Sequence, residues 1–397
     1  MTSIITALPR DGRLLFLTRF TRLFAYGAVS VVLVLYLTSL GLDASQIGLL
    51  MTLTLVGDTV ISLWLTTRAD RLGRRRMLMI GAALMAIAGL AFAFTANFLF
   101  LLIAGTIGVI SPSGNEVGPF LPIEQAALAH VVAPDYRTEI FGWYTLAGAI
   151  ATALGSLFAG VISQSMPYRV VVLLYAVLGV VLAIWFGALS PSAEAAPPQT
   201  SPFLGLGDSR TIVLRLAGLF ALDSFAGGFV VQSFAAYWFY LRFGVNPATL
   251  GAIFFGANLL AGLSALLAVR LAARFGLVRT MVFTHLPSNV LLILVPLMPT
   301  LALATAVLFM RFSISQMDVP TRQSYLMAIV RPDERSAAGG VAGVARTIGA
   351  GIAPVFAGLL FARPALINIP FFIAGTLKIV YDLLLYRGFS SLGDQRL

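Results

Sequence analysis

Ionisable side chains lie inside apolar stretches of this sequence that are long enough to cross a lipid bilayer. A charge at bilayer depth is costly unless it is paired or hydrated, so each such residue is a candidate for binding a solute or a proton. The sequence has no cysteine and only two histidines, far apart, and therefore predicts no catalytic group, no metal site and no cofactor. The charged candidates are Arg19, Arg22, Asp58, Glu116, Glu124, Asp223, Arg311, Asp318, Arg322 and Arg346.

The elements that carry these charges are predicted to be membrane-spanning helices. Of the 397 residues, 59% are hydrophobic and 11% are charged, whereas soluble domains have roughly 25% charged residues. The apolar runs are continuous, and backbone polar groups in lipid must be bonded within a helix or a closed barrel, so helices are indicated. We expect an all-α membrane protein with twelve spans at 13–39, 46–67, 76–96, 98–129, 137–164, 168–189, 211–239, 247–273, 278–298, 300–330, 335–362 and 366–388.

The fourth span has an unusual composition. Three prolines and two glycines between Ser111 and Pro122 surround Asn115 and Glu116. Such a run should break the helix, and irregular backbone at membrane depth is tolerated only where it lines a cavity or is buried in protein. Asn115 and Glu116 are therefore the leading candidates for a solute or proton site.

The two halves of the sequence resemble each other. When the sequence is aligned with itself at a shift of 198 positions without a gap, 13 of the 39 residues from 122 to 160 are identical to their partners. The matches include the P-D-x-R loops that begin at Pro134 and Pro332. Shared helix composition does not produce matched loops, so internal duplication is the better account. The Pro/Ser/Ala-rich segment 190–210 is then a linker between two pseudo-symmetric six-helix bundles, 1–189 and 211–397.

The loop after the second span reads D-R-L-G-R-R-R from Asp70 to Arg76. It resembles the conserved cytoplasmic loop of the major facilitator superfamily, with Thr66 where the family pattern opens on glycine. Membership implies alternating access of the two bundles around a midplane site, with this loop as a conformational latch. The alternative is that its arginines only fix topology. The latch residues are predicted to be Asp70, Arg71, Gly73 and Arg74, together with an Asp58–Arg346 pair that is equally compatible with a static role.

The resemblance also implies that spans one, four, seven and ten line the central cavity, and most of the buried charges lie on them. Depth, counted at ~1.5 Å per residue, divides these charges into two groups. Candidates for solute binding or proton coupling near the midplane are Asn115, Glu116, Asp223, Arg311, Gln316 and Asp318, and Asp318 with Arg322 is equally consistent with a local ion pair. Candidates for a cytoplasmic gate are Arg19, Arg22, Glu124 and Arg322, although Arg19 and Arg22 are equally able to extend to the headgroups.

The distribution of arginines predicts the orientation of the chain. Loops on the side of both termini hold most of them, whereas the opposite loops hold only Arg169, Arg242 and Arg363. By the positive-inside rule both termini are cytoplasmic, and the net charge of +10 reflects topology rather than nucleic-acid binding. A plasma or inner membrane location and a monomer are expected, with the bilayer, a small solute and protons as partners.

We therefore expect a secondary active transporter of a small polar or charged solute, coupled to protons through Glu116 or Asp223. No nucleotide-binding loop of the G-x-x-x-x-G-K type is present, which disfavours ATP-driven pumping. Export as an antiporter is preferred over a proton-coupled uptake permease on resemblance, although Ser156 replaces a proline typical of exporters. A non-transporting sensor with the same fold is the alternative from another class, and an enzyme is not expected. His130 and His285 are interpreted as packing residues rather than proton relays.

Overall fold

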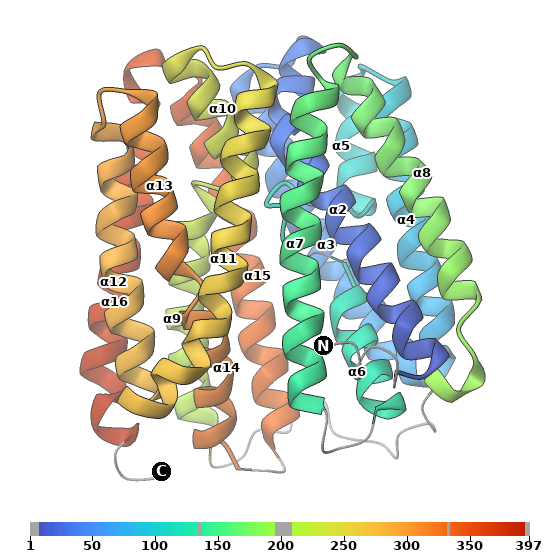
Figure 1. Ribbon diagram of the computed structural model, residues 1–397, viewed down its shortest axis with the longest axis vertical. Coiled ribbons are helices and arrows are strands. Elements are labelled where there is room, and N and C mark those ends of the chain that lie inside the picture. Colours follow the sequence, from blue (N-terminus) through green and yellow to red (C-terminus); the bar gives the residue numbers. More distant parts are fainter. Residues whose placement is uncertain (1–7, 117, 133–136, 195–208, 332–333, 394–397) are drawn as a thin grey trace. The chain divides into compact units, whose positions relative to one another are not determined.

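The computed structural model describes residues 8–116, 118–132, 137–194, 209–331 and 334–393 (Figure 1). Every regular element within these ranges is a helix, which confirms the all-α prediction. The predicted linker, 190–210, lies largely outside the described residues. Contacts divide the chain into two compact units, which we call unit 1 and unit 2.

Unit 1 comprises residues up to 42, 53–200 and 245–255. Its central helix is α2, which packs against α7 and α8, while α4 packs against α8. Most of α2 is buried, as expected of a helix that is apolar on nearly all sides and surrounded by others. The helices of this unit are α2 (Arg10–Ser39), most of α3 (Ala44–Leu72), α4 (Arg74–Phe94), α5 (Phe98–Ile107), α6 (Phe120–Val131), α7 (Arg137–Ile162) and α8 (Tyr168–Gly187).

Unit 2 comprises residues 43–52, 201–244 and 256–397. Here α9 packs against α15 and α16, and α12 packs against α13, α14 and α16. Its core includes Phe220, Tyr325 and Tyr381, all at most 2% exposed. The helices are α9 (Arg210–Gly228), α10 (Gln232–Phe243), most of α11 (Pro247–Phe275), α12 (Leu277–Leu294), α13 (Leu301–Ser315), α14 (Asp318–Ile329), α15 (Arg335–Phe361) and α16 (Ile369–Gly393).

Ten helical segments among the described residues are long and apolar enough to cross a membrane. The predicted spans four and ten are not among them, because each is divided into two shorter helices. Span four becomes α5 and α6, separated by residues 108–119, and span ten becomes α13 and α14, separated at Gln316 and Met317. The predicted break in span four is thus confirmed, and Gly114 and Gly118 adopt positive φ angles of 70° and 78° within it.

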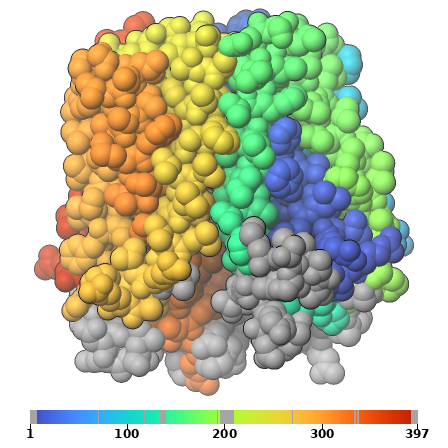
Figure 2. Space-filling view, viewed as in Figure 1, coloured from blue at the N-terminus to red at the C-terminus, as the bar shows by residue number. Residues whose placement is uncertain are grey.

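The surface of the helices is apolar where a membrane would contact it. Helices α7 and α8, drawn in shades of green in Figure 2, carry exposed Leu154, Phe158, Val177 and Ile184. Exposed apolar patches of this extent are unusual in soluble proteins. The chain is an integral membrane protein.

The duplicated F-A-G triplet occupies equivalent packing positions in the two units. In unit 1, a Cβ atom added to Gly160 of α7 would lie 2.7 Å from the Cα of Gly251 on α11. In unit 2, a Cβ added to Gly358 of α15 would lie 2.8 Å from the Cα of Gly48 on α3. Both triplets therefore end on a glycine where two helix backbones approach closely, as small residues permit in membrane helices.

This packing predicts opposite effects for one substitution at two positions of α7. Gly160→Ala should destabilise the protein by about 1–3 kcal/mol, because the added methyl group meets backbone rather than a flexible side chain. Gly142→Ala is the matched control, since nothing lies within 4 Å of its added Cβ. It should be neutral or stabilise by about 0.5–1 kcal/mol through helix propensity. Thermal unfolding in detergent measures both, and equal melting temperatures would contradict the close approach.

Candidate functional site

A cluster of four paired charges lies inside unit 1. The Arg22 Nη2 and Glu124 Oε2 atoms are 2.6 Å apart, and both side chains are 0% exposed. Glu116 pairs with Arg19 at 2.6 Å and with Arg22 at 3.1 Å. We call Arg19, Arg22, Glu116 and Glu124 the unit 1 cluster. Removing one partner from such a set leaves a buried charge uncompensated, which typically costs about 3–5 kcal/mol.

Local sequence explains how these side chains meet. Arg19 and Arg22 are three residues apart on α2 and so share one face of that helix. Glu116 stands in the irregular segment 108–119, and Glu124 lies in α6 just beyond it. A Cβ on Gly148 of α7 would lie 2.7 Å from Arg19 Nε, so this glycine leaves room for the guanidinium.

Hydroxyl groups and aromatic rings complete the unit 1 cluster. Glu124 accepts hydrogen bonds from Tyr144 Oη at 2.6 Å and from Thr18 Oγ1 at 2.9 Å. The Arg19 guanidinium lies 4.3 Å from the centroid of the Tyr144 ring, and that of Arg22 lies 4.7 Å from the Phe120 ring. Both carboxylate oxygens of Glu124 are thus bonded, whereas the side chain of Glu116 is 19% exposed.

A second cluster lies inside unit 2, around Asp223 of α9. Its carboxylate pairs with Lys378 Nζ at 2.5 Å and with Arg322 Nη1 at 3.2 Å, and His285 Nε2 is 3.8 Å away. Arg322 also pairs with Asp318 at 3.2 Å, the i to i+4 contact expected from sequence. We call these five residues, together with Asp382, the unit 2 cluster.

His285 connects two aspartates of the unit 2 cluster. Its Nδ1 atom is 2.9 Å from Asp382 Oδ1, while Nε2 faces Asp223. Asn289 donates a hydrogen bond to the other oxygen of Asp382 at 2.8 Å. The interpretation of His285 as a packing residue is therefore incomplete, because the ring lies within a network of charges that the sequence did not reveal.

Two further cations of unit 2 have unused hydrogen-bonding capacity. The Nε atoms of Arg311 and Arg346 have no hydrogen-bond partner within the described ranges. Both guanidiniums lie within electrostatic reach of Asp223 and Asp318, whose oxygens already contact Lys378 or Arg322. Counted with Lys378 and Arg322, four permanent cations in this region face three aspartates, so the region has an excess of positive charge.

The structure brings together some of the predicted residues and assigns others to different units. The gate residues Arg19, Arg22 and Glu124 share the unit 1 cluster, whereas Arg322 belongs to the unit 2 cluster. Asn115 is exposed and Gln316 is half-buried. Asp58 belongs to unit 1 and Arg346 to unit 2, so their pairing stays a prediction.

The loop with the family pattern is organised by a residue that sequence reasoning missed. Gly73 has φ 100° and precedes α4, while Glu194 accepts hydrogen bonds from the backbone N–H groups of Arg74 at 2.6 Å and Arg75 at 3.1 Å. The Arg74 side chain is buried and donates to the Ala193 carbonyl, whereas Arg71 is exposed. The side chain of Asp70 lies outside the described parts, and the latch stays a prediction.

Lys378 and Asp382 of the unit 2 cluster, and Tyr144, which contacts the unit 1 cluster, are not among the residues predicted from the sequence. A signal was available for two of them, because Lys378 and Asp382 are four residues apart inside the predicted span 366–388. The bilayer cost of charge applies to them as it does to Asp223. Tyr144 gave no such signal, since a tyrosine in a spanning helix is common.

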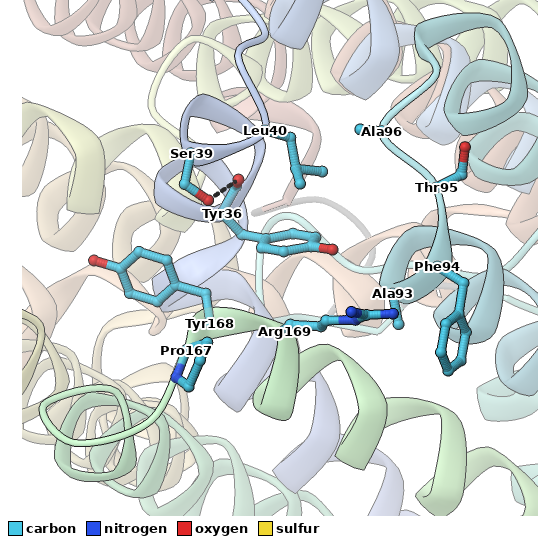
Figure 3. A pocket seen from close by; sticks show the side chains of 10 residues that line it. All are labelled: Tyr36, Ser39, Leu40, Ala93, Phe94, Thr95, Ala96, Pro167, Tyr168 and Arg169. Carbon is cyan, nitrogen blue, oxygen red and sulfur yellow. Dashed lines mark hydrogen bonds between the residues drawn. The ribbon is translucent and has the colours of Figure 1, made fainter.

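A hollow of about 500 Å³ opens elsewhere in unit 1, near the end of α2. Figure 3 shows Tyr36, Phe94 and Arg169 among the side chains that line it. The Arg169 guanidinium lies 4.6 Å from the Phe94 ring centroid, and Tyr36 donates to the Phe92 carbonyl at 2.6 Å. None of the paired charges described above lines this hollow, so it is not part of the candidate site.

Comparison with known proteins identifies the family. The family model of the Major Facilitator Superfamily matches residues 15–241. An uncharacterized membrane protein of Saccharomyces cerevisiae, YJR124C, is 32% identical over 418 residues, covering 95% of this chain and 93% of the yeast protein. The chain belongs to the Major Facilitator Superfamily, whose members are transporters rather than enzymes.

Other similarities are partial or concern the fold alone. The quinolone resistance protein NorA of Staphylococcus aureus is 30% identical over 145 residues, 36% of each chain. The crystal structure of the nucleoside transporter NupG superposes with a TM-score of 0.75 at 14% identity, covering 96% of this chain and 99% of NupG. This likeness supports a transporter fold.

The unit 1 cluster yields a prediction about stability. Glu124→Gln should lower the free energy of unfolding by about 3–5 kcal/mol, because Arg22 then stays buried without its closest counter-charge. Tyr144→Phe removes one hydrogen bond to the same carboxylate and should cost only about 1–2 kcal/mol. Thermal unfolding of the purified variants shows which substitution lowers the stability more. A Tyr144→Phe effect as large as that of Glu124→Gln would show that the ion pair is not the main stabilising contact.

Proposed function

We propose that this protein is a secondary active transporter that exports a small polar or charged solute by alternating access in exchange for protons. The observation that carries the proposal is a cluster of buried, mutually paired charges inside each unit. Such clusters are expensive in a membrane protein and are usually retained because they bind a solute or an ion. Membership in a transporter family supports the same conclusion.

Glu116 supports proton coupling. Its side chain is 19% exposed, whereas that of Glu124, the other acid of the unit 1 cluster, is 0% exposed. Both cationic partners of Glu116 come from α2. A proton on Glu116 neutralises the group that holds Arg19 and Arg22, which changes the charge offered to a solute. Solute and proton would then compete for the same carboxylate, as exchange requires. Asp223, which already contacts Lys378 and Arg322, is the second candidate.

The direction of transport is proposed on a partial likeness. The alignment with a quinolone resistance protein, which covers 36% of this chain, favours transport out of the cell. The proposal includes cytoplasmic termini, which the distribution of arginines favours. It also includes a plasma or inner membrane location and a monomeric state, which are expected of the family. Uptake by a permease is the alternative direction. A non-transporting sensor would bind the solute and show no flux.

The proposed coupling can be tested in liposomes with Glu116→Gln. A thermal-shift screen of purified protein against a broad solute library, beginning with a quinolone, supplies the solute whose flux is followed. In the wild type a proton gradient should drive accumulation, whereas Glu116→Gln should lose this drive by about tenfold or more and retain exchange without a gradient. Asp43→Asn, an exposed acid ahead of α3, is the control. Unchanged proton-driven flux in Glu116→Gln would exclude this residue as the coupling group.

The excess of cations in unit 2 favours a solute that carries an anionic group. Guanidinium groups bind carboxylates and phosphates through parallel hydrogen bonds, and Arg311 and Arg346 each have a free Nε donor within the described part of the chain. A carboxylate on the solute would balance the positive charge there. We therefore include an anionic group in the proposed solute class.

Neutralising either arginine should weaken binding of anionic solutes selectively. Arg311→Gln and Arg346→Gln are each expected to raise the dissociation constant of a carboxylate-bearing solute by about tenfold, or about 1.4 kcal/mol. The corresponding amide or ester should bind equally well to all variants. Arg363→Gln, an exposed cation, should change neither. Thermal-shift titrations at constant ionic strength measure the constants, and equal weakening of charged and neutral solutes would contradict anion recognition.

A further inference from the structure

An apolar groove of about 480 Å³ lies between α4 and α5 of unit 1. Phe94 lines both this groove and the hollow shown in Figure 3, so the two adjoin. Large exposed side chains line the groove, among them Ile87 at 61% and Phe100 at 65% exposure. Small residues line it where the helices meet: Ala88 is 1% exposed, and a Cβ on Gly108 would lie 2.3 Å from the Ala88 Cβ. These small residues leave a channel between two apolar rims.

The groove has the length of one lipid acyl chain. On α4 its lining residues run from Leu84 to Phe94, ten positions apart, which corresponds to ~15 Å at ~1.5 Å per residue. Half of the hydrocarbon core of a bilayer is also ~15 Å thick. The groove therefore extends from the end of α4 to about the middle of the membrane, which is the depth that a chain of one leaflet occupies.

The hollow at the end of the groove contains a cation without an acidic partner. Of the ten residues that line it, Arg169 alone is charged. Its side chain is exposed, and its guanidinium lies 4.6 Å from the centroid of the Phe94 ring. Arg169 has no ion pair within the described ranges. A guanidinium held against an aromatic ring in this way can offer its N–H groups to an anion.

The other polar groups of the hollow suit the level of lipid headgroups. Tyr36 and Tyr168 bring phenol rings, which are enriched where a membrane meets water. Thr95 Oγ1 accepts a hydrogen bond from the backbone N–H of Asn97 at 3.1 Å, which leaves its own O–H able to donate to an oxygen of a ligand. The hollow thus combines a cation, a hydroxyl donor and aromatic rings directly above an apolar groove.

We propose that unit 1 binds one anionic phospholipid here, with its phosphate at Arg169 and one acyl chain in the groove between α4 and α5. Guanidinium groups bind phosphate oxygens through parallel hydrogen bonds. The groove alone would not select a class of lipid, because all lipid chains are equally apolar. An arginine without an acid beside it favours a headgroup of net negative charge. The inference goes beyond the proposed transport function, since no residue of the unit 1 cluster lines either cavity.

Native mass spectrometry of the full chain in detergent measures the headgroup preference. The protein is mixed with equal amounts of dioleoyl phosphatidylglycerol and dioleoyl phosphatidylcholine, whose adducts differ in mass. The wild type should carry more of the anionic lipid, and Arg169→Gln should lower the ratio of anionic to zwitterionic adducts by about fivefold, as expected for the loss of one arginine near a membrane surface. Arg363→Gln, at another exposed cation, is the control and should leave the ratio unchanged.

Ala91→Phe tests the groove without changing any charge. Ala91 is half-buried and lines the groove, so a phenyl ring there should displace the chain and weaken binding of both dioleoyl lipids by about threefold or more. Dihexanoyl phosphatidylglycerol, whose chains are short, should bind equally well to this variant and to the wild type. Ala83→Phe, at an exposed position of α4 outside the groove, is the matched control. Ala104→Leu, on α5, serves if Ala91→Phe does not fold.

Three outcomes would overturn the inference. An unchanged adduct ratio in Arg169→Gln would show that the phosphate is not bound in the hollow. An equal loss in Arg363→Gln would assign the preference to the overall positive charge of the chain. Glycerol phosphate, which has the headgroup without chains, should give a much smaller thermal shift than the dioleoyl lipid, and an equal shift would indicate a site for a water-soluble anion. Absence of flux in liposomes would reject the proposed function and leave these results intact.

Discussion

The structure depends on the pairing of charges that cannot reach water. Arg22 and Glu124 are fully buried, and each lowers the cost of keeping the other charged in a spanning helix. Their contact fixes the position of α6 against α2, and Tyr144 and Thr18 complete the coordination. In unit 2, Asp223 has the same role toward α14 and α16 through Arg322 and Lys378. Charge pairing therefore provides specific contacts between helices that apolar packing alone would not distinguish.

Broken helices supply the geometry that these pairs need. A continuous helix would carry Glu116 past α2 at a fixed rise of about 1.5 Å per residue, whereas the segment 108–119 lets its backbone turn toward Arg19 and Arg22. The freed backbone groups are partly bonded by Tyr175, Ser111 and Thr152. Irregular backbone and buried charge thus occur together, because each requires the polar partners that the other supplies.

Much of the fold could be predicted from the sequence, and less of the site. Continuous apolar runs gave the helices, and the prolines and glycines near Glu116 gave the break in span four. The sequence places Arg22 and Glu124 at similar depth in the membrane, so their pairing could be predicted. Glu194 was not, because its partners are backbone N–H groups 119 and 120 residues away. Lys378 and Asp382 lie outside the spans that the family resemblance implies as cavity-lining, although the cost of their charges in a bilayer follows from the sequence.

The left-handed backbone at Gly118 has a consequence for variants that alter no charge. Any other residue there would resist a φ of 78°, and its Cβ would lie 3.0 Å from both the Phe120 ring and the Val109 side chain. Chains that differ from this one only at position 118 would then have to repack the break in span four while retaining every ionisable group.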